Sequence, residues 1–154
     1  MRTKTIVAGA ALAAALLAGC GTLSEPQKLA QLVADARDIA DGATTAAMTE
    51  TKGEARPRLV EAQAALTTLA QLPEGQATVD DLLRVLQGLP LERLQSERGQ
   101  VYATLGRVLV RRVVPLATDR TVDVGAKGAV RQVSAALADG IGSALGRWRP
   151  PPAK

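Results

Sequence analysis

The chain has 154 residues, with 19 basic and 15 acidic side chains and a formal net charge of +4. It contains no histidine and a single cysteine, so the commonest general base and metal ligand is missing and no intrachain disulfide can form. With no phenylalanine, one tyrosine and one tryptophan, a core must be built from leucine, valine and alanine, a composition that favours closely packed helices.

The N-terminal segment has the pattern of an export signal. Arg2 and Lys4 precede an uncharged run of 13 residues, from Ile6 to Ala18. This run is shorter than the roughly 20 apolar residues that a membrane-spanning helix needs. A positive start, a short apolar run and small residues after it are typical of a secretory signal.

The end of this run carries a more specific motif, formed by Leu17, Ala18, Gly19 and Cys20. The motif resembles the lipobox of bacterial lipoproteins, and the resemblance covers residues 1–20 only. It implies cleavage before Cys20, diacylglycerol on the Cys20 sulfur and usually an acyl chain such as palmitate on the new amino terminus. Residues 1–19 would then be the signal peptide, and residues 20–26 the lipidated cysteine and tether. An uncleaved apolar helix, or an ordinary secretory signal with a chance cysteine, is the alternative.

The lipobox resemblance also implies a location. Two or three acyl chains hold a protein to a membrane firmly, whereas one chain binds only marginally. Residue 21 is glycine rather than aspartate. In a Gram-negative host, this resembles the pattern for export to the periplasmic face of the outer membrane.

The rest of the chain predicts an all-α domain over residues 27–146, a small bundle of four or five amphipathic helices. Apolar residues recur with helical spacing in five segments, which predicts helices over residues 27–47, 54–72, 79–87, 91–114 and 122–145. Pro57 falls in the first turn of the second helix, where proline is tolerated. Thr78 and Asp81 predict an N-cap for the third helix. We expect Pro115 to end the fourth.

Two of these helices have features that concern packing. Residues 107–114 are rich enough in β-branched side chains to form a strand, but the helical spacing of the surrounding apolar residues favours a helix. In the last helix, Gly142 and Gly146 have the small-residue spacing that allows close helix approach. Since Arg131 and Asp139 argue against insertion into a membrane, we expect this approach to occur within a soluble bundle.

Three aspartates in the first helix, Asp35, Asp38 and Asp41, are spaced by three residues. Such spacing could suggest a cation site. Calcium, however, requires six to eight oxygen ligands from a folded loop. We therefore interpret these residues as a solvated face, with Arg37 and Asp41 as an ion pair four residues apart, and predict no metal site.

Charge is distributed unevenly along the chain. Residues 20–97 carry 7 basic and 12 acidic side chains, and residues 98–154 carry 10 basic and 3 acidic ones. The halves could attract each other within one fold, or the basic half could face anionic material. The candidate contact residues for an anionic surface are Arg107, Arg111, Arg147, Trp148 and Arg149. The last three begin a proline-rich tail, residues 147–154, which could equally be an ordinary disordered end.

Catalytic motifs are absent from the sequence. There is no Ser-x-x-Lys spacing and no phosphate-binding Gly-x-x-x-x-Gly-Lys loop. We therefore expect a non-catalytic envelope lipoprotein without a cofactor, bound to the membrane through its anchor. It would have a structural or protein-interaction role toward an envelope protein or an anionic surface, and no nucleic-acid partner. One alternative is a periplasmic carrier or chaperone for an apolar ligand, which the lack of aromatics disfavours. An enzyme of unknown class is the other.

Overall fold

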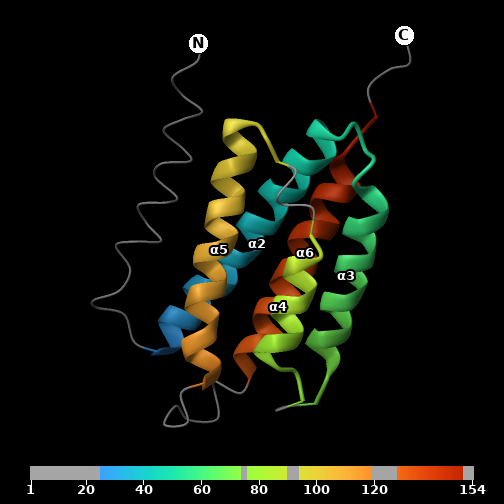
Figure 1. The fold of residues 1–154 in the computed structure, drawn as a ribbon. Coiled ribbons are helices and arrows are strands. Elements are labelled where there is room, and N and C mark those ends of the chain that lie inside the picture. Colours follow the sequence, from blue (N-terminus) through green and yellow to red (C-terminus); the bar gives the residue numbers. More distant parts are fainter. Residues whose placement is uncertain (1–24, 74–75, 90–93, 119–127, 151–154) are drawn as a thin grey trace.

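The computed structural model describes residues 25–73, 76–89, 94–118 and 128–150 (Figure 1). Within these ranges the chain forms helices and no strands, which confirms the predicted small all-α bundle. The helices are α2 (Glu25–Glu50), α3 (Arg56–Gln71), α4 (Val79–Gln87), α5 (Glu97–Thr118) and α6 (Ala129–Arg147).

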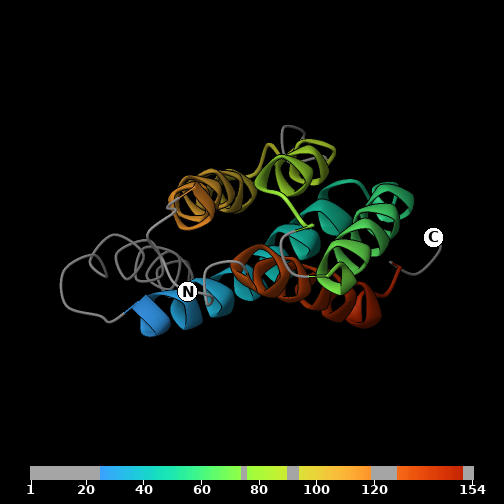
Figure 2. The same ribbon diagram turned by 90° about the horizontal axis from the view of Figure 1, so that it is seen from below.

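The helices are arranged in two unequal layers. The most extensive contacts join α6 to α2 and to α3, and these three helices form the larger layer. Helices α4 and α5 lie together on one side of it (Figure 2). Helices α2 and α6 run in the same direction, from the lower to the upper end in Figure 1, whereas α5 runs the opposite way. The smaller layer thus covers one face of the α2–α6 pair.

The predicted apolar faces of α2 and α6 form the centre of the core. Ala36 of α2 and Val133 of α6 are fully buried. The two helices pack closely at Gly140, where an added Cβ would lie 2.8 Å from the Cβ of Ala40 and 3.0 Å from the Asp41 nitrogen. The sequence predicted close helix approach at Gly142 and Gly146. The prediction for Gly146 was wrong, because an added Cβ at that position would meet nothing within 4 Å.

The first three helices follow the sequence closely. Helix α2 continues to Glu50, one turn beyond its predicted end, and α3 has Pro57 in its first turn as expected. The predicted N-cap of α4 is confirmed as a reciprocal capping box. In it, Thr78 Oγ1 accepts from the Asp81 amide at 3.2 Å, and Asp81 Oδ2 accepts from the Thr78 amide at 3.3 Å.

Helix α5 differs from its prediction at both ends. Residues 94–96 are not helical and residues 90–93 lie outside the described ranges, so α5 begins at Glu97 and not at Leu91. Its start is set by Ser96, whose Oγ accepts from the Gly99 amide at 3.0 Å. Pro115 does not end the helix, which continues to Thr118. Proline disfavours a helix because it lacks the amide donor and its ring crowds the carbonyl four residues earlier, but it does not prevent the last turn of α5 from forming.

Helix α6 begins at Ala129, seven residues after its predicted start at Val122, which lies outside the described ranges. It extends through Arg147, so the first residue of the predicted tail belongs to the helix. The helical prediction for residues 107–114 is confirmed, because they lie within α5.

Candidate functional site

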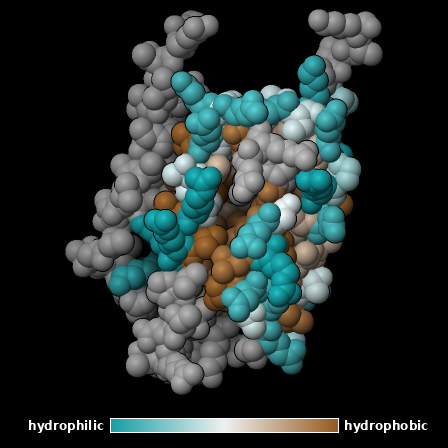
Figure 3. Space-filling view, in the orientation of Figure 1, coloured by the Kyte–Doolittle hydropathy of each residue, from teal (hydrophilic) through white to brown (hydrophobic). Residues whose placement is uncertain are grey.

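An apolar cavity of about 370 Å³ lies between the two layers of helices. Every described helix contributes side chains to its walls. Figure 3 shows a hydrophobic band along the gap between α5 and α4, bordered by hydrophilic side chains on both sides. The cavity is therefore open to the surface between these two helices, and its volume lies in the range of small-molecule sites.

Small side chains on the floor of the cavity explain why it exists. Helix α2 presents Ala40, Ala43 and Ala47 to it, all of them buried. Opposite them, the short helix α4 contributes Leu83 and Leu86, which are only half-buried. A chain without phenylalanine has few side chains large enough to fill the space between an alanine-rich helix and a short amphipathic one.

The one tyrosine of the chain lines this cavity from α5. The Tyr102 ring lies against Gly42 of α2, where even a Cβ atom would collide with the ring. The Arg98 guanidinium lies 5.9 Å from the centroid of the same ring, within cation–π distance. Gly42 therefore allows the ring to be positioned at the wall, and Tyr102 was not among the predicted site residues.

The mouth of the cavity carries the first two predicted contact residues. Arg107 and Arg111 of α5 line the cavity and are exposed. Gln87, the last residue of α4, is also exposed and lines it. No aspartate or glutamate is among the described lining residues. The structure thus combines an apolar interior with a cationic rim, which the sequence had not connected.

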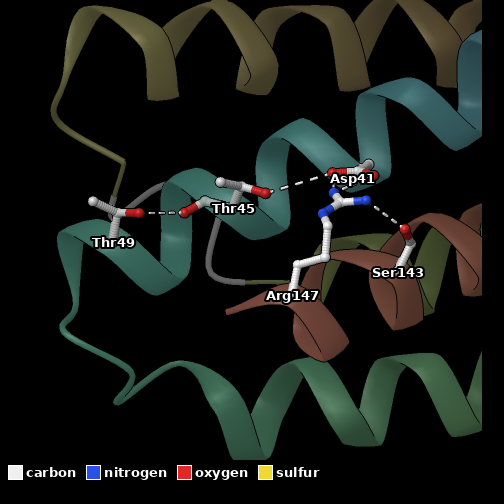
Figure 4. Close-up of polar contacts among 5 residues, drawn as sticks. All are labelled: Asp41, Thr45, Thr49, Ser143 and Arg147. Atoms are coloured by element: carbon white, nitrogen blue, oxygen red, sulfur yellow. Dashed lines mark hydrogen bonds and ion pairs between the residues drawn. The ribbon is translucent and has the colours of Figure 1, made fainter. Parts of the chain in front are cut away.

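Arg147 and Trp148 are engaged within the domain rather than held out as a tail. Arg147 of α6 forms an ion pair with Asp41 of α2, and its Nη1 donates to Ser143 Oγ at 2.7 Å (Figure 4). Trp148 is half-buried against the core, and its ring lies over Gly53, which has a φ of +93° and no Cβ to obstruct the ring. The proposed pairing of Asp41 with Arg37 is therefore replaced by a pairing between helices.

Arg149, the third residue of this group, is exposed and donates to the Gly146 carbonyl at 3.1 Å. With Lys52 it borders a second, more polar hollow at the C-terminal ends of α2 and α6. Helix C-terminal ends carry partial negative charge, which opposes the binding of an anion there. Contact of Arg147, Trp148 and Arg149 with an anionic surface stays a prediction.

The aspartates of α2 do not form one solvated face, because Asp35 is buried. Burial raises the pKa of the Asp35 carboxyl, while a hydrogen bond with Gln31 and the charge of Arg112 on α5 act in the opposite direction. Its Oδ2 atom has no hydrogen-bond partner among the described residues. Asp38 is exposed, as predicted. In the described ranges, no three His, Cys, Asp or Glu side chains cluster closely enough to hold a metal ion.

No protein-family model matches the chain, and neither a curated protein nor a solved structure is detectably similar to it. The candidate site therefore depends on its own geometry. In the part of the chain that the structure describes, no helix is both long and apolar enough to cross a bilayer. Cys20 and the lipobox motif lie outside the described residues.

Proposed function

We propose that the chain is an envelope lipoprotein, anchored at Cys20, whose helical domain holds an apolar ligand in the cavity between its two layers. The observation that carries this proposal is the cavity itself, an apolar space of about 370 Å³ that reaches the surface between α4 and α5. Half-buried Leu83, Leu86 and Val110 face this space. An apolar ligand would cover them, and each methylene that it buries contributes about 0.8 kcal/mol.

The size of the cavity favours a small molecule over a helix from a partner protein. A helix with its side chains is about 10 Å wide, and it would have to enter between α4 and α5 over several turns. The cavity, at about 370 Å³, is in the size range of small-molecule sites. A hydrocarbon chain is narrower and can enter between two helices that pack lightly, and α4 and α5 make few contacts with each other.

This proposal modifies the role expected from the sequence. Display of a helical surface to an envelope protein needs no internal space, whereas a carrier or a lipid-binding protein does. The role remains non-catalytic in the proposal, and the membrane is still the partner through the anchor. In a Gram-negative host, the signal would place the domain at the periplasmic face of the outer membrane. A tether there keeps the domain close to a pool of apolar ligand.

The test places a larger side chain in the cavity. Gly106 of α5 lines the cavity, and leucine has a higher helix propensity than glycine by up to ~1 kcal/mol. Gly106→Leu should therefore keep the helix and occupy ligand space. Gly146→Leu is the matched control, because an added Cβ at that exposed position of α6 meets nothing within 4 Å. The full chain, reconstituted in phosphatidylcholine vesicles, is photolabelled with a diazirine derivative of dodecanol.

The expected result is labelling of the wild-type chain that excess dodecanol competes away. Labelling should fall at least about fivefold in Gly106→Leu, equivalent to roughly 1 kcal/mol of binding, and stay unchanged in Gly146→Leu. Equal competition-sensitive labelling of all three proteins would contradict the proposal, as would an absence of such labelling in the wild type. Circular dichroism of each variant checks that the helices are retained.

A further inference from the structure

Two arginines stand at the mouth of the cavity without a described partner. Arg107 and Arg111 are four residues apart on α5, so they share a helix face with their Cβ atoms about 6 Å apart. Both are exposed, and neither guanidinium forms a hydrogen bond or an ion pair with another described residue. Elsewhere, Arg147 is paired with Asp41 and Arg131 donates to the Ala70 carbonyl at 3.1 Å. The mouth therefore holds two guanidinium groups with unused donors.

The other groups at the mouth do not neutralise this pair. Among the other described lining residues, Gln87 has an amide nitrogen that can also donate, and Thr44 and Tyr102 carry uncharged hydroxyl groups. The apolar side chains Leu86, Leu89 and Val110 line the same space. A ligand that matches both the apolar lining and the two arginines has a hydrocarbon chain and an anionic head group. A neutral apolar molecule would leave the guanidinium groups with water alone.

We infer that the cavity binds a single-chain fatty acid, with the hydrocarbon chain between the helix layers and the carboxylate held by Arg107 and Arg111. This inference rests on the proposed function and names the ligand class for the same cavity. Guanidinium groups present donors in a planar fork that matches a carboxylate, and such charge-assisted hydrogen bonds are stronger than neutral ones.

The volume of the cavity favours a ligand with one chain. At about 370 Å³ it lies at the small end of the range of about 300–1,000 Å³ for ligand sites. Such a volume suits one hydrocarbon chain better than the two acyl chains of a membrane phospholipid. A fatty acid of medium length can place its whole chain inside and leave its head at the rim.

The helix ends around the mouth favour a singly charged carboxylate over a phosphate. Phosphate sites commonly use the free amides at a helix N-terminus. Here Arg107 and Arg111 lie within α5, where backbone amides bond along the helix, and Gln87 ends α4. The partial negative charge at the C-terminal end of α4 opposes an anion, and it does so more strongly for a doubly charged one.

The experiment compares two probes of equal chain length in the same vesicles. The full chain, reconstituted in phosphatidylcholine vesicles, is photolabelled with diazirine derivatives of dodecanoate and of dodecanol. The test variant is Arg107→Gln with Arg111→Gln, and the control is Arg56→Gln with Arg58→Gln. The control removes the same charge from exposed positions of α3 that do not line the cavity. Because partitioning of each probe into lipid is the same for every variant, it cancels when the ratio of the two labelling yields is compared between variants.

The ratio of dodecanoate to dodecanol labelling should fall at least about fivefold in the Arg107/Arg111 variant and stay within about twofold of wild type in the control. Unlabelled dodecanoate should compete better than dodecyl phosphate. An unchanged ratio in the Arg107/Arg111 variant would overturn the fatty-acid inference. Labelling by dodecanol would in that case still support the cavity as an apolar ligand site. Stronger competition by dodecyl phosphate would also overturn it. Failure of both probes to label the wild type would overturn the proposed function as well.

Discussion

Arg147 of α6 binds the carboxylate of Asp41 in α2, although the two residues are 106 positions apart in the chain. Its Nη2 lies 2.6 Å from Asp41 Oδ2, and its Nη1 donates to Ser143 Oγ one turn earlier on its own helix (Figure 4). The pair fixes the end of α6 against α2. These two helices carry the centre of the core and line the cavity, so this contact helps to hold the cavity walls in place.

The first prediction concerns that pair. Arg147→Gln should lower the free energy of unfolding by up to about 1 kcal/mol, a modest loss because Arg147 is 60% exposed and Asp41 28% exposed. Asp41→Asn should cost a similar amount, and the double variant should cost less than the sum. Urea unfolding followed by circular dichroism measures these values. Arg149→Gln is the control, since its guanidinium contacts only nearby backbone carbonyls. Full additivity of the two changes would contradict a direct interaction.

The second prediction uses two glycines of α6 with opposite surroundings. Gly146→Ala should raise the free energy of unfolding by up to ~1 kcal/mol, because alanine is the better helix former and the new Cβ meets nothing. Gly140→Ala should lower it by roughly 1–3 kcal/mol, because the new Cβ collides with the Arg37 carbonyl and Ala40. Urea unfolding of the two variants should therefore change in opposite directions. Stabilisation by both would place the close contact of α2 and α6 elsewhere.

The third prediction is a pH dependence at Asp35. Burial raises the pKa of its carboxyl above the ordinary value of 3.8, so the folded protein holds that proton more tightly than the unfolded chain does. This contribution to stability is present at low pH and is lost as pH rises through the folded pKa. Asp35→Asn should remove the dependence. The stability of the variant relative to wild type should rise with pH above about 4 and then level off. Thermal unfolding across this range measures it, and a relative stability that falls with rising pH would contradict the assignment.

The fourth prediction has the opposite sign and concerns the start of α5. Glu50 of α2 accepts from the Gln95 amide at 2.8 Å and from the Ser96 hydroxyl, and the hydroxyl bond is the main reason that its pKa is lowered from 4.5. The contribution is present above pH 4.5 and is lost as pH falls through the folded pKa. Glu50→Gln should cost less than about 1 kcal/mol at neutral pH, because the site is exposed. The difference from wild type should vanish in acid. A cost that persists unchanged at low pH would assign the effect to packing.

The fifth prediction concerns the proposed anchor. Mass spectrometry of the mature protein should find acylated Cys20 as the first residue. Cys20→Ala should block processing or release the protein from the membrane, whereas Ser24→Ala, a change close to the motif, should not. Full membrane retention of the Cys20 variant with normal cleavage would show that another feature attaches the protein.

The sequence predicted the helices well where local signals are strong. The capping box of Thr78 and Asp81 placed α4 correctly, since both partners lie within one turn. The prediction from the sequence misplaced the start of α5, because the Ser96 cap acts together with Glu50, which is 46 residues away in the chain. Local periodicity cannot reveal such a partner. The same limit applies to Asp41. Arg37 is its nearest basic residue in the sequence and was a plausible partner, but its actual partner, Arg147, lies on another helix.

The cavity could be predicted only in part. Arg107 and Arg111 were predicted as contact residues for an anionic surface, and the structure places both of them at the cavity. The apolar part depends on how Ala43 of α2 faces Leu86 of α4 across the two layers. A helix periodicity shows which residues point inward but not whether the facing side chains fill the space between them. The available signal in the sequence was the presence of three leucines, Leu82, Leu83 and Leu86, on a helix of nine residues.

The most direct test of the account is the position at which a bound apolar probe reacts. The full chain in phosphatidylcholine vesicles is photolabelled with the diazirine derivative of dodecanol and digested, and the labelled residues are identified by mass spectrometry. The account predicts that competition-sensitive labels fall on the facing sides of α4 and α5, around Leu86 and Val110. Labels confined to exposed apolar residues outside the cavity, such as Val60 and Val101, would contradict it.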